Sequence, residues 1–161
     1  AGSTPHGDMT LDIVDGLVQE DSLRISWKKG HESQFYWQAD VPADFSQMEQ
    51  DGGALVMEFM INKYPKGSVT QRMDCGWPCR GEIDVTEFYK SIPLRQRSKV
   101  GISLSCFKKM GVDMEKITSP LVLVSKDEFE ITFSDVRVIA NASEDNTIQL
   151  CDSEVATLLQ D

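Results

Sequence analysis

The stretch Ala54–Ile61 reads Ala-Leu-Val-Met-Glu-Phe-Met-Ile, and it decides the class of fold. Apolar side chains fill both faces of a strand here: Leu55, Met57, Phe59 and Ile61 on one face, Val56 and Met60 on the other. A strand with one face in water alternates apolar and polar residues, so near-continuous apolarity predicts a central position in a sheet.

Three further runs alternate apolar and polar residues with the period of a half-buried strand. They are Leu23–Trp27, Val100–Cys106 and Phe129–Ala140. Trp27 continues the apolar face of the first run, which predicts that its indole lies in the core. Asp135 interrupts the third run, which predicts a long strand with a bend.

The polar stretch Val41–Gly53 is predicted to be a loop with one helical turn.

Turn signals recur at intervals of roughly 8 to 12 residues and separate about nine or ten short strands, with no long helix. This pattern predicts an all-β fold, a jelly-roll β-sandwich. A chain of 161 residues suits one domain, which we place at residues 9–161. Residues 1–8, Ala-Gly-Ser-Thr-Pro-His-Gly-Asp, lack an initiator Met and are interpreted as a vector scar or linker, so we expect a piece of a longer protein.

The composition excludes two classes of partner. The chain has 16 basic and 26 acidic residues and a formal net charge of -10, which opposes binding to nucleic acid or to an anionic membrane surface. It contains no apolar run of about 18 residues, so no membrane-spanning helix is expected. A neutral polysaccharide remains a possible partner.

The segment Met73–Tyr89 holds the most unusual residues of the chain. Cys75 and Cys79 flank Gly76-Trp77-Pro78, and the glycine and proline favour a tight reversal that brings the two thiols within disulfide range. Such a small ring gains little loop-closure entropy, so its effect would be local, fixing Trp77 in one orientation. The alternative is four free thiols.

The other two cysteines are harder to join by strand parity. Cys106 shares the parity of the apolar residues in its run, whereas Cys151 has the parity opposite to Ile148 and Leu150. Cys106 is predicted to point into the core and Cys151 away from it. Cys106 could instead reach the loop cysteines.

No catalytic residues and no metal site are predicted. The chain has two histidines, and His6 lies in the interpreted scar, so no Ser/His/Asp set can be built. Cys75 and Cys79 lack a second ligand pair, which argues against zinc. A structural calcium ion bound by acidic residues at a sandwich edge stays open, without assigned ligands, and no other cofactor is expected.

Aromatic residues in turns are the candidate contact residues. Trp77 lies at the tip of the braced loop, and Tyr64 lies in another turn, so both can stack on a sugar or pack against a neighbouring domain. In the strand around Tyr36 and Trp37, one ring must face away from the other. Trp37 is a candidate contact residue. The alternative is that the rings of Tyr36 and Trp37 both lie in the core.

Several segments resemble a known family. They are Cys75–Gly81, Leu104–Phe107, Gly111–Ile117 before Pro120, and the strand Phe129–Val138. These segments resemble the C-terminal galactose-binding-like domain of bacterial exo-β-glucanases and β-glucosidases of glycoside hydrolase family 3, of the marine exo-1,3/1,4-β-glucanase type. The strand pattern is also similar to carbohydrate-binding-module sandwiches. One departure is Arg97-Ser98-Lys99, where the family leads us to expect an aromatic residue.

The resemblance implies a function. The family's catalytic residues lie in other domains, so the chain is expected to be a non-catalytic accessory domain of a secreted or periplasmic bacterial glucanase. Its expected partners are the catalytic domains of the same parent chain, which it would stabilise while lending a loop near the substrate entrance. The alternative is an autonomous carbohydrate-binding module for β-glucans.

Overall fold

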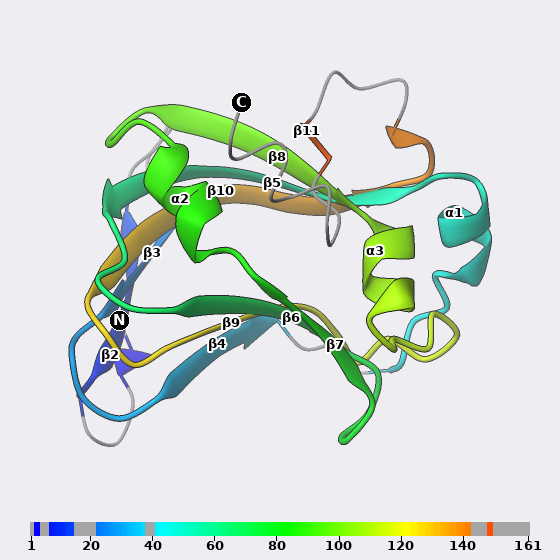
Figure 1. Cartoon of the computed structure of the whole chain (residues 1–161), viewed down its shortest axis with the longest axis horizontal. Helices are drawn as coiled ribbons and strands as arrows, with labels where there is room; N and C mark the ends of the chain where they lie inside the picture. The colour runs from blue at the N-terminus through cyan, green and yellow to red at the C-terminus, as the bar shows by residue number, and fades with distance from the viewer. Residues whose placement is uncertain (1, 4–6, 15–21, 38–40, 143–147, 150–161) are drawn as a thin grey trace.

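The computed structural model describes residues 2–3, 7–14, 22–37, 41–142 and 148–149, which fold into two packed β-sheets (Figure 1). The strands are β1 (Gly2–Ser3), β2 (Met9–Val14), β3 (Ser22–Trp27), β4 (Ser33–Trp37), β5 (Ala54–Lys63), β6 (Val69–Asp74), β7 (Arg80–Asp84), β8 (Arg97–Ser103), β9 (Ser119–Ser125), β10 (Phe129–Ile139) and β11 (Ile148–Gln149). Within these described residues, three short helices join them: α1 (Ser46–Gln50), α2 (Thr86–Ser91) and α3 (Leu104–Lys109). The predicted β-sandwich is confirmed.

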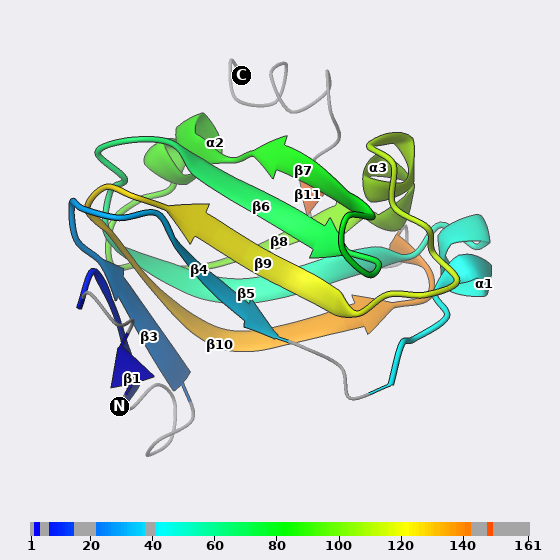
Figure 2. The same cartoon turned by 90° about the horizontal axis from the view of Figure 1, so that it is seen from below.

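The larger sheet has the order β1-β2-β3-β10-β5-β8-β11, and the smaller one has the order β4-β9-β6-β7. All neighbours are antiparallel except β8 and β11. Strand β5 lies between β10 and β8, which confirms the central position predicted from its apolar residues. Figure 2 looks onto the outer face of the smaller sheet, with the larger sheet behind it.

Aromatic rings stack on one another within the largely aliphatic core between the sheets. Trp27 is 2% exposed, stacks on Phe129 with 5.4 Å between ring centroids, and donates its indole N–H to the carbonyl of Ser33 at 3.1 Å. Tyr89 is fully buried against Phe129 and Phe59, and burial raises the pKa of its phenol well above the usual range. The core position predicted for Trp27 is therefore confirmed.

Strand β10 bends where the sequence indicates. Its pairing with β5 shifts register between Phe133 and Asp135, because Ser134 has no partner residue on β5. A bulge of this kind lets one long strand follow the curvature of the sheet.

The end of β8 differs from the sequence prediction. The alternating run was expected to continue as a strand to Cys106, but the strand ends at Ser103 and Leu104–Lys109 form α3. The Leu104 N–H donates to the carbonyl of Gly53 at 3.0 Å, and Leu104, Cys106 and Phe107 are all buried. Alternation over so few residues does not distinguish a strand from one buried helical turn.

Helix α2 was also not anticipated. At its start, the Asp84 carboxylate accepts hydrogen bonds from the backbone N–H and the hydroxyl of Thr86, at 2.9 and 2.6 Å. Helix α1 lies within the predicted loop and supplies its expected helical turn.

At the N-terminus, Gly2 pairs with Leu11 and Ser3 with Thr10, so β1 adds an edge strand next to β2. The assignment of residues 1–8 to a scar or linker stays a prediction. The sequence also predicts a short strand at Leu17–Val18 and an acidic, fraying tail at Asp152–Asp161, and both lie outside the described residues.

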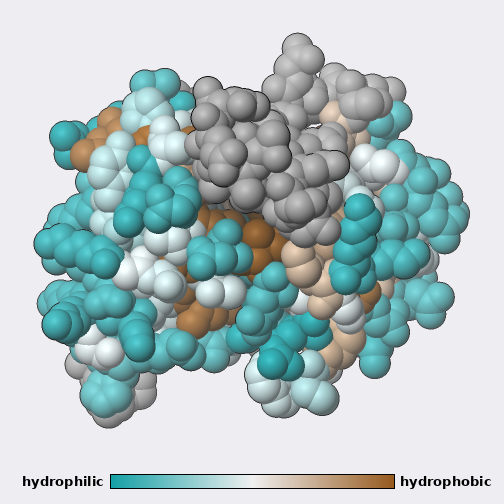
Figure 3. Space-filling view, viewed as in Figure 1, coloured by the Kyte–Doolittle hydropathy of each residue, from teal (hydrophilic) through white to brown (hydrophobic). Residues whose placement is uncertain are grey.

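Viewed along the same direction as Figure 1, the surface is largely hydrophilic, with apolar side chains gathered near the middle of this face (Figure 3). Within the described ranges, no helix has the length and apolarity needed to cross a bilayer.

Candidate functional site

The loop between β6 and β7 is closed by a disulfide. Cys75 and Cys79 are bonded, with 5.0 Å between their Cα atoms, which confirms the predicted pairing. The Cys75 N–H donates to the carbonyl of Cys79 at 2.9 Å, and the Cys79 N–H donates to the carbonyl of Gly76 at 2.8 Å. Gly76 has a φ of 88°, a conformation that glycine adopts without steric cost. The loop is therefore a tight reversal.

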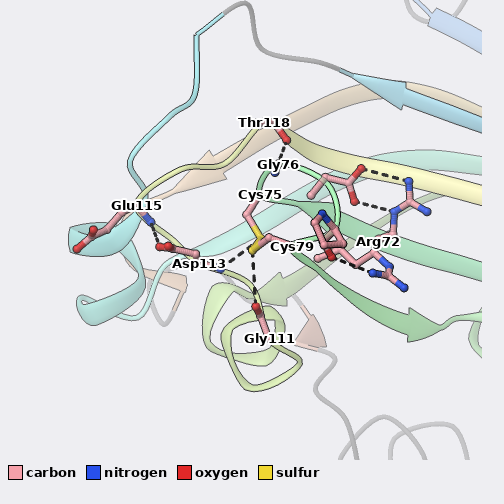
Figure 4. Close-up of a disulfide and its surroundings, with 11 residues drawn as sticks. Arg72, Cys75, Gly76, Cys79, Gly111, Asp113, Glu115 and Thr118 are labelled. Atoms are coloured by element: carbon pink, nitrogen blue, oxygen red, sulfur yellow. Dashed lines mark hydrogen bonds and ion pairs between the residues drawn. A yellow bond between two sulfur atoms is a disulfide. The ribbon is translucent and has the colours of Figure 1, made fainter.

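The connection between α3 and β9 braces this loop from outside (Figure 4). The Asp113 N–H donates to the sulfur of Cys75 at 3.4 Å, and the Gly76 N–H donates to the hydroxyl of Thr118 at 3.1 Å. The sulfur of Cys79 lies 3.9 Å from the carbonyl oxygen of Gly111. Because Cys75 is fully buried, the loop is anchored in the core and only its tip projects.

Gly81 lets β7 approach the end of α3. A Cβ atom at this position would lie 2.7 Å from a methyl group of Val112 and 2.9 Å from the Cβ of Met110. Contacts this short would force the strand away from the helix, so glycine is needed at the base of the loop.

Cys106 is also disulfide-bonded, and none of the cysteines within the described ranges is free. The parity that made its pairing look difficult does not apply, because Cys106 lies on α3 and not on a strand. Cys151 lies outside the described residues.

Trp77 projects from the tip of the loop and is 69% exposed. The guanidinium carbons of Arg80 and Arg72 lie 4.3 and 5.5 Å from its ring centroid. Arg80 also donates to the carbonyl of Pro78 at 2.8 Å and to the carboxylate of Glu82 at 3.1 Å. The indole is thus held by cation–π contacts while much of its surface stays in solvent.

Arg72 occupies the outer face of the smaller sheet and is only 9% exposed. It donates to both carboxylate oxygens of Asp74, at 2.6 and 3.1 Å, and to the amide oxygen of Gln34 at 2.7 Å. The bidentate geometry fixes the guanidinium plane beside Trp77.

Tyr36 lies on the same face. It is paired with Val122 across β4 and β9, and Val122 is paired with Arg72 across β9 and β6. Two strand spacings place the Cα atoms of Tyr36 and Arg72 about 10 Å apart. Tyr36 is 54% exposed, so this face carries an exposed phenol, a fixed guanidinium and an exposed indole.

Trp37 and Tyr64, the other two predicted contact residues, are placed differently. Trp37 packs edge-on against Phe35 and Phe133, with centroids 4.9 and 5.8 Å apart, and stays 37% exposed at the rim of the sandwich. Tyr64 donates its hydroxyl to the carbonyl of Ile92 at 2.7 Å and precedes β6, whereas Trp77 follows β6. The two turns thus lie at opposite ends of this strand. The contact roles of Trp77, Tyr64 and Trp37 stay predictions.

Sequence reasoning missed Arg72 and Arg80. Their proximity to Trp77 depends on strand register, and the only signal in the sequence is the short spacing of Arg72, Trp77 and Arg80 around the loop.

Within the described part of the chain, no cluster of His, Cys, Asp or Glu side chains could hold a metal ion. A pocket of about 420 Å³ lies elsewhere, between Thr10 on β2 and Lys63 on β5, with Ser26 and Glu130 hydrogen-bonded at 2.7 Å in its lining.

A family model described as galactose-binding domain-like, Exop_C, matches residues 1–138. The chain belongs to the Exop_C family. A comparison with curated protein sequences finds no match.

Solved structures share this fold. The extra C-terminal domain (X) of the exo-1,3/1,4-β-glucanase ExoP from a Pseudoalteromonas species is 18% identical, with a TM-score of 0.75, and the match covers 92% of this Exop_C chain and 80% of that domain. Against the longer ExoP structure, the identity is 20% and the TM-score 0.75, with 93% of this chain and 18% of that one covered. The Exop_C chain thus spans about a fifth of the longer protein.

A carbohydrate-binding module also has this fold. The family 30 module of the cellulosomal cellulase Cel9D-Cel44B of Clostridium thermocellum is 21% identical, with a TM-score of 0.65 and coverage of 90% of this chain and 91% of that one. At these identities the likeness establishes a galactose-binding-like β-sandwich and no more.

Proposed function

We propose that this Exop_C domain is the non-catalytic accessory domain of a bacterial exo-β-glucanase of glycoside hydrolase family 3. It stabilises the catalytic domains of the same parent chain and lends the Trp77 loop to the path of the glucan substrate. The shared family and fold with the X domain of ExoP, an exo-1,3/1,4-β-glucanase, support this proposal.

The observation that carries the proposal is the combination of exposure and bracing at Trp77. The indole is 69% exposed, yet a disulfide and two hydrogen bonds from outside fix the loop that bears it. Leaving a large apolar ring in water forgoes the free energy of its burial, and rigid aromatic side chains of this kind are typical of contact surfaces.

The charged groups near Trp77 suit contact better than catalysis. Glycosidases need one carboxyl group poised as an acid and a second one as a base or nucleophile. Asp74 instead forms an ion pair with Arg72, and Glu82 forms one with Arg80.

The disulfide-bonded cysteines fit an oxidising compartment, so we infer that the domain is secreted or periplasmic.

The test is the parent enzyme with and without this domain. Deleting the domain should lower the melting temperature, and Trp77→Ala should raise KM for laminarin while leaving KM for an aryl β-glucoside unchanged. The isolated chain should release no product from the aryl glucoside. Turnover by the isolated chain, or a deletion without effect on melting temperature, contradicts the proposal.

A second candidate function is an autonomous carbohydrate-binding module. The observation that favours it is the exposed pair Tyr36 and Trp77 on one side of a fold shared with a family 30 module. Affinity electrophoresis of the isolated chain on lichenan, laminarin and xylan tests it, because binding must then occur without the catalytic domains.

A further inference from the structure

We propose that the outer face of the sheet β4-β9-β6-β7 binds a neutral β-linked glucan chain, which runs from Tyr36 across Arg72 to Trp77. This inference rests on the proposed contact with glucan and specifies where and how that contact is made. Figure 2 looks directly onto this face. We call it the Tyr36–Trp77 face.

Exposed aromatic rings mark its two ends. Tyr36 and Trp77 are 54% and 69% exposed, the highest values among the aromatic side chains within the described ranges. The pyranose rings of a β-linked glucan carry their hydroxyls at the edges and C–H groups on both faces. Such flat apolar faces pack on aromatic rings, which leaves the hydroxyls free for hydrogen bonds.

Hydrogen-bond donors are fixed between the two rings. The Nε and Nη2 atoms of Arg72 are occupied by Asp74 and Gln34, which hold the guanidinium in place. Within the described part of the chain, the Nη1 atom of Arg72 and the amide nitrogen of Gln34 have no recorded partner. Gln34 is exposed, and its amide can donate to a sugar hydroxyl oxygen without rearrangement, because the hydrogen bond from Arg72 already orients its side chain.

The charge of the face selects a neutral ligand. Arg72 is paired with Asp74, and Arg80 with Glu82, at nitrogen–oxygen distances of 2.6 and 3.1 Å. An anionic polysaccharide would have to compete with these carboxylates for the arginines, and the net charge of -10 repels it at longer range. A neutral chain meets neither obstacle.

The length of the face requires an oligosaccharide. Tyr36 and Arg72 are separated by two strand spacings, about 10 Å, and the guanidinium carbon of Arg72 lies 5.5 Å from the centroid of the Trp77 ring. A single glucose covers one ring at most, whereas a tetrasaccharide can reach both rings. Glucose should therefore compete poorly with a polymer, and laminaritetraose or cellotetraose should compete well.

The experiment is affinity electrophoresis of the full 161-residue chain in gels that contain lichenan, laminarin or polygalacturonate. The variants are Tyr36→Ala, Trp77→Ala and Gln34→Ala, and Tyr64→Ala tests the other predicted contact ring, which lies at the opposite end of β6 and outside the Tyr36–Trp77 face. Thermal melting of each variant verifies its fold before the gels are read.

We expect retardation in the neutral glucan gels and none in polygalacturonate. Tyr36→Ala and Trp77→Ala should each weaken binding by about tenfold or more, as is usual for central aromatic contacts, and Tyr64→Ala should leave it unchanged. Glucan should also shift the tryptophan emission of the chain, and Trp77→Ala should abolish the shift.

Three outcomes overturn the inference. Retardation that survives Tyr36→Ala and Trp77→Ala places the sugar elsewhere on the domain. Retardation by polygalacturonate contradicts a neutral ligand. No retardation on any glucan, together with a parent enzyme whose melting temperature falls without the domain, removes the glucan site and leaves the accessory role standing, so the two failures are distinguishable.

Discussion

Arg80 lies against Trp77, with its guanidinium carbon 4.3 Å from the centroid of the indole ring. The same side chain donates to the carbonyl of Pro78 and to the carboxylate of Glu82. One arginine thus connects the exposed ring, the loop that bears it and the strand that follows.

Arg80→Ala should release the Trp77 ring with little loss of stability. Exposed cation–π pairs contribute about 0.5–1 kcal/mol, so the free energy of unfolding should fall by no more than about 1 kcal/mol. Acrylamide should quench tryptophan fluorescence more strongly than in the wild type, and Arg80→Lys should restore part of the protection. Unchanged quenching in Arg80→Ala would show that the ring is held by other contacts.

The disulfide should contribute modestly to stability. For a ring as short as Cys75–Cys79, the loop-closure relation gives about 2 kcal/mol. The double variant Cys75→Ala/Cys79→Ala should therefore melt about 4 to 8 °C lower than the wild type. Alkylation without reductant should label neither cysteine, and recovery of label at either one would contradict the bond.

Asp74→Ala should destabilise the chain more than removal of the whole ion pair. Arg72 and Asp74 have side chains only 11% and 19% exposed, and an unpaired charge at such a depth costs about 3 kcal/mol. The double variant Arg72→Met/Asp74→Ala removes both charges. Its free energy of unfolding, measured with urea, should therefore fall less than that of Asp74→Ala alone.

The matched control is the pair Arg24 and Asp12, at 3.4 Å with side chains 41% and 38% exposed. Asp12→Ala should cost less than about 1 kcal/mol, because water screens this pair. Equal losses in Asp74→Ala and Asp12→Ala would mean that burial does not distinguish the two pairs.

Tyr89→Phe should change the dependence of stability on alkaline pH. Burial raises the pKa of Tyr89, so above about pH 10 the unfolded chain releases a proton that the folded chain keeps. Stability is then full below the unfolded pKa and falls as the pH rises towards the folded value. Urea midpoints measured from about pH 8 to about pH 11 should fall less steeply in Tyr89→Phe. Tyr36→Phe, a change in an exposed ring, is the control.

Much of the sandwich follows from sequence periodicity. The apolar residues of β5 predict its central place, and Asp135 predicts the irregularity in β10, because a strand repeats every two residues and one extra residue is visible as a break. Only the first part of α3, Leu104–Cys106, was mistaken for strand, because buried residues at Leu104 and Cys106 fit either period over so short a run.

The candidate site was only half visible in the sequence. Cys75, Cys79 and Trp77 are neighbours along the chain, so local turn chemistry predicts their arrangement. Tyr36 and Arg72 come from β4 and β6, and they share a face because each is paired with Val122 of β9. Such a relationship depends on the register of three strands, which no local pattern in the sequence specifies.

The Trp77 loop is hydrogen-bonded to a segment 38 to 42 residues further along the chain. The Gly76 N–H donates to the Thr118 hydroxyl, and the Asp113 N–H donates to the Cys75 sulfur. The hydrogen-exchange rates of these two amides therefore measure local opening of the loop. A molecule that seats on the indole should slow both amides together, and one that binds the far end of β6 should slow neither.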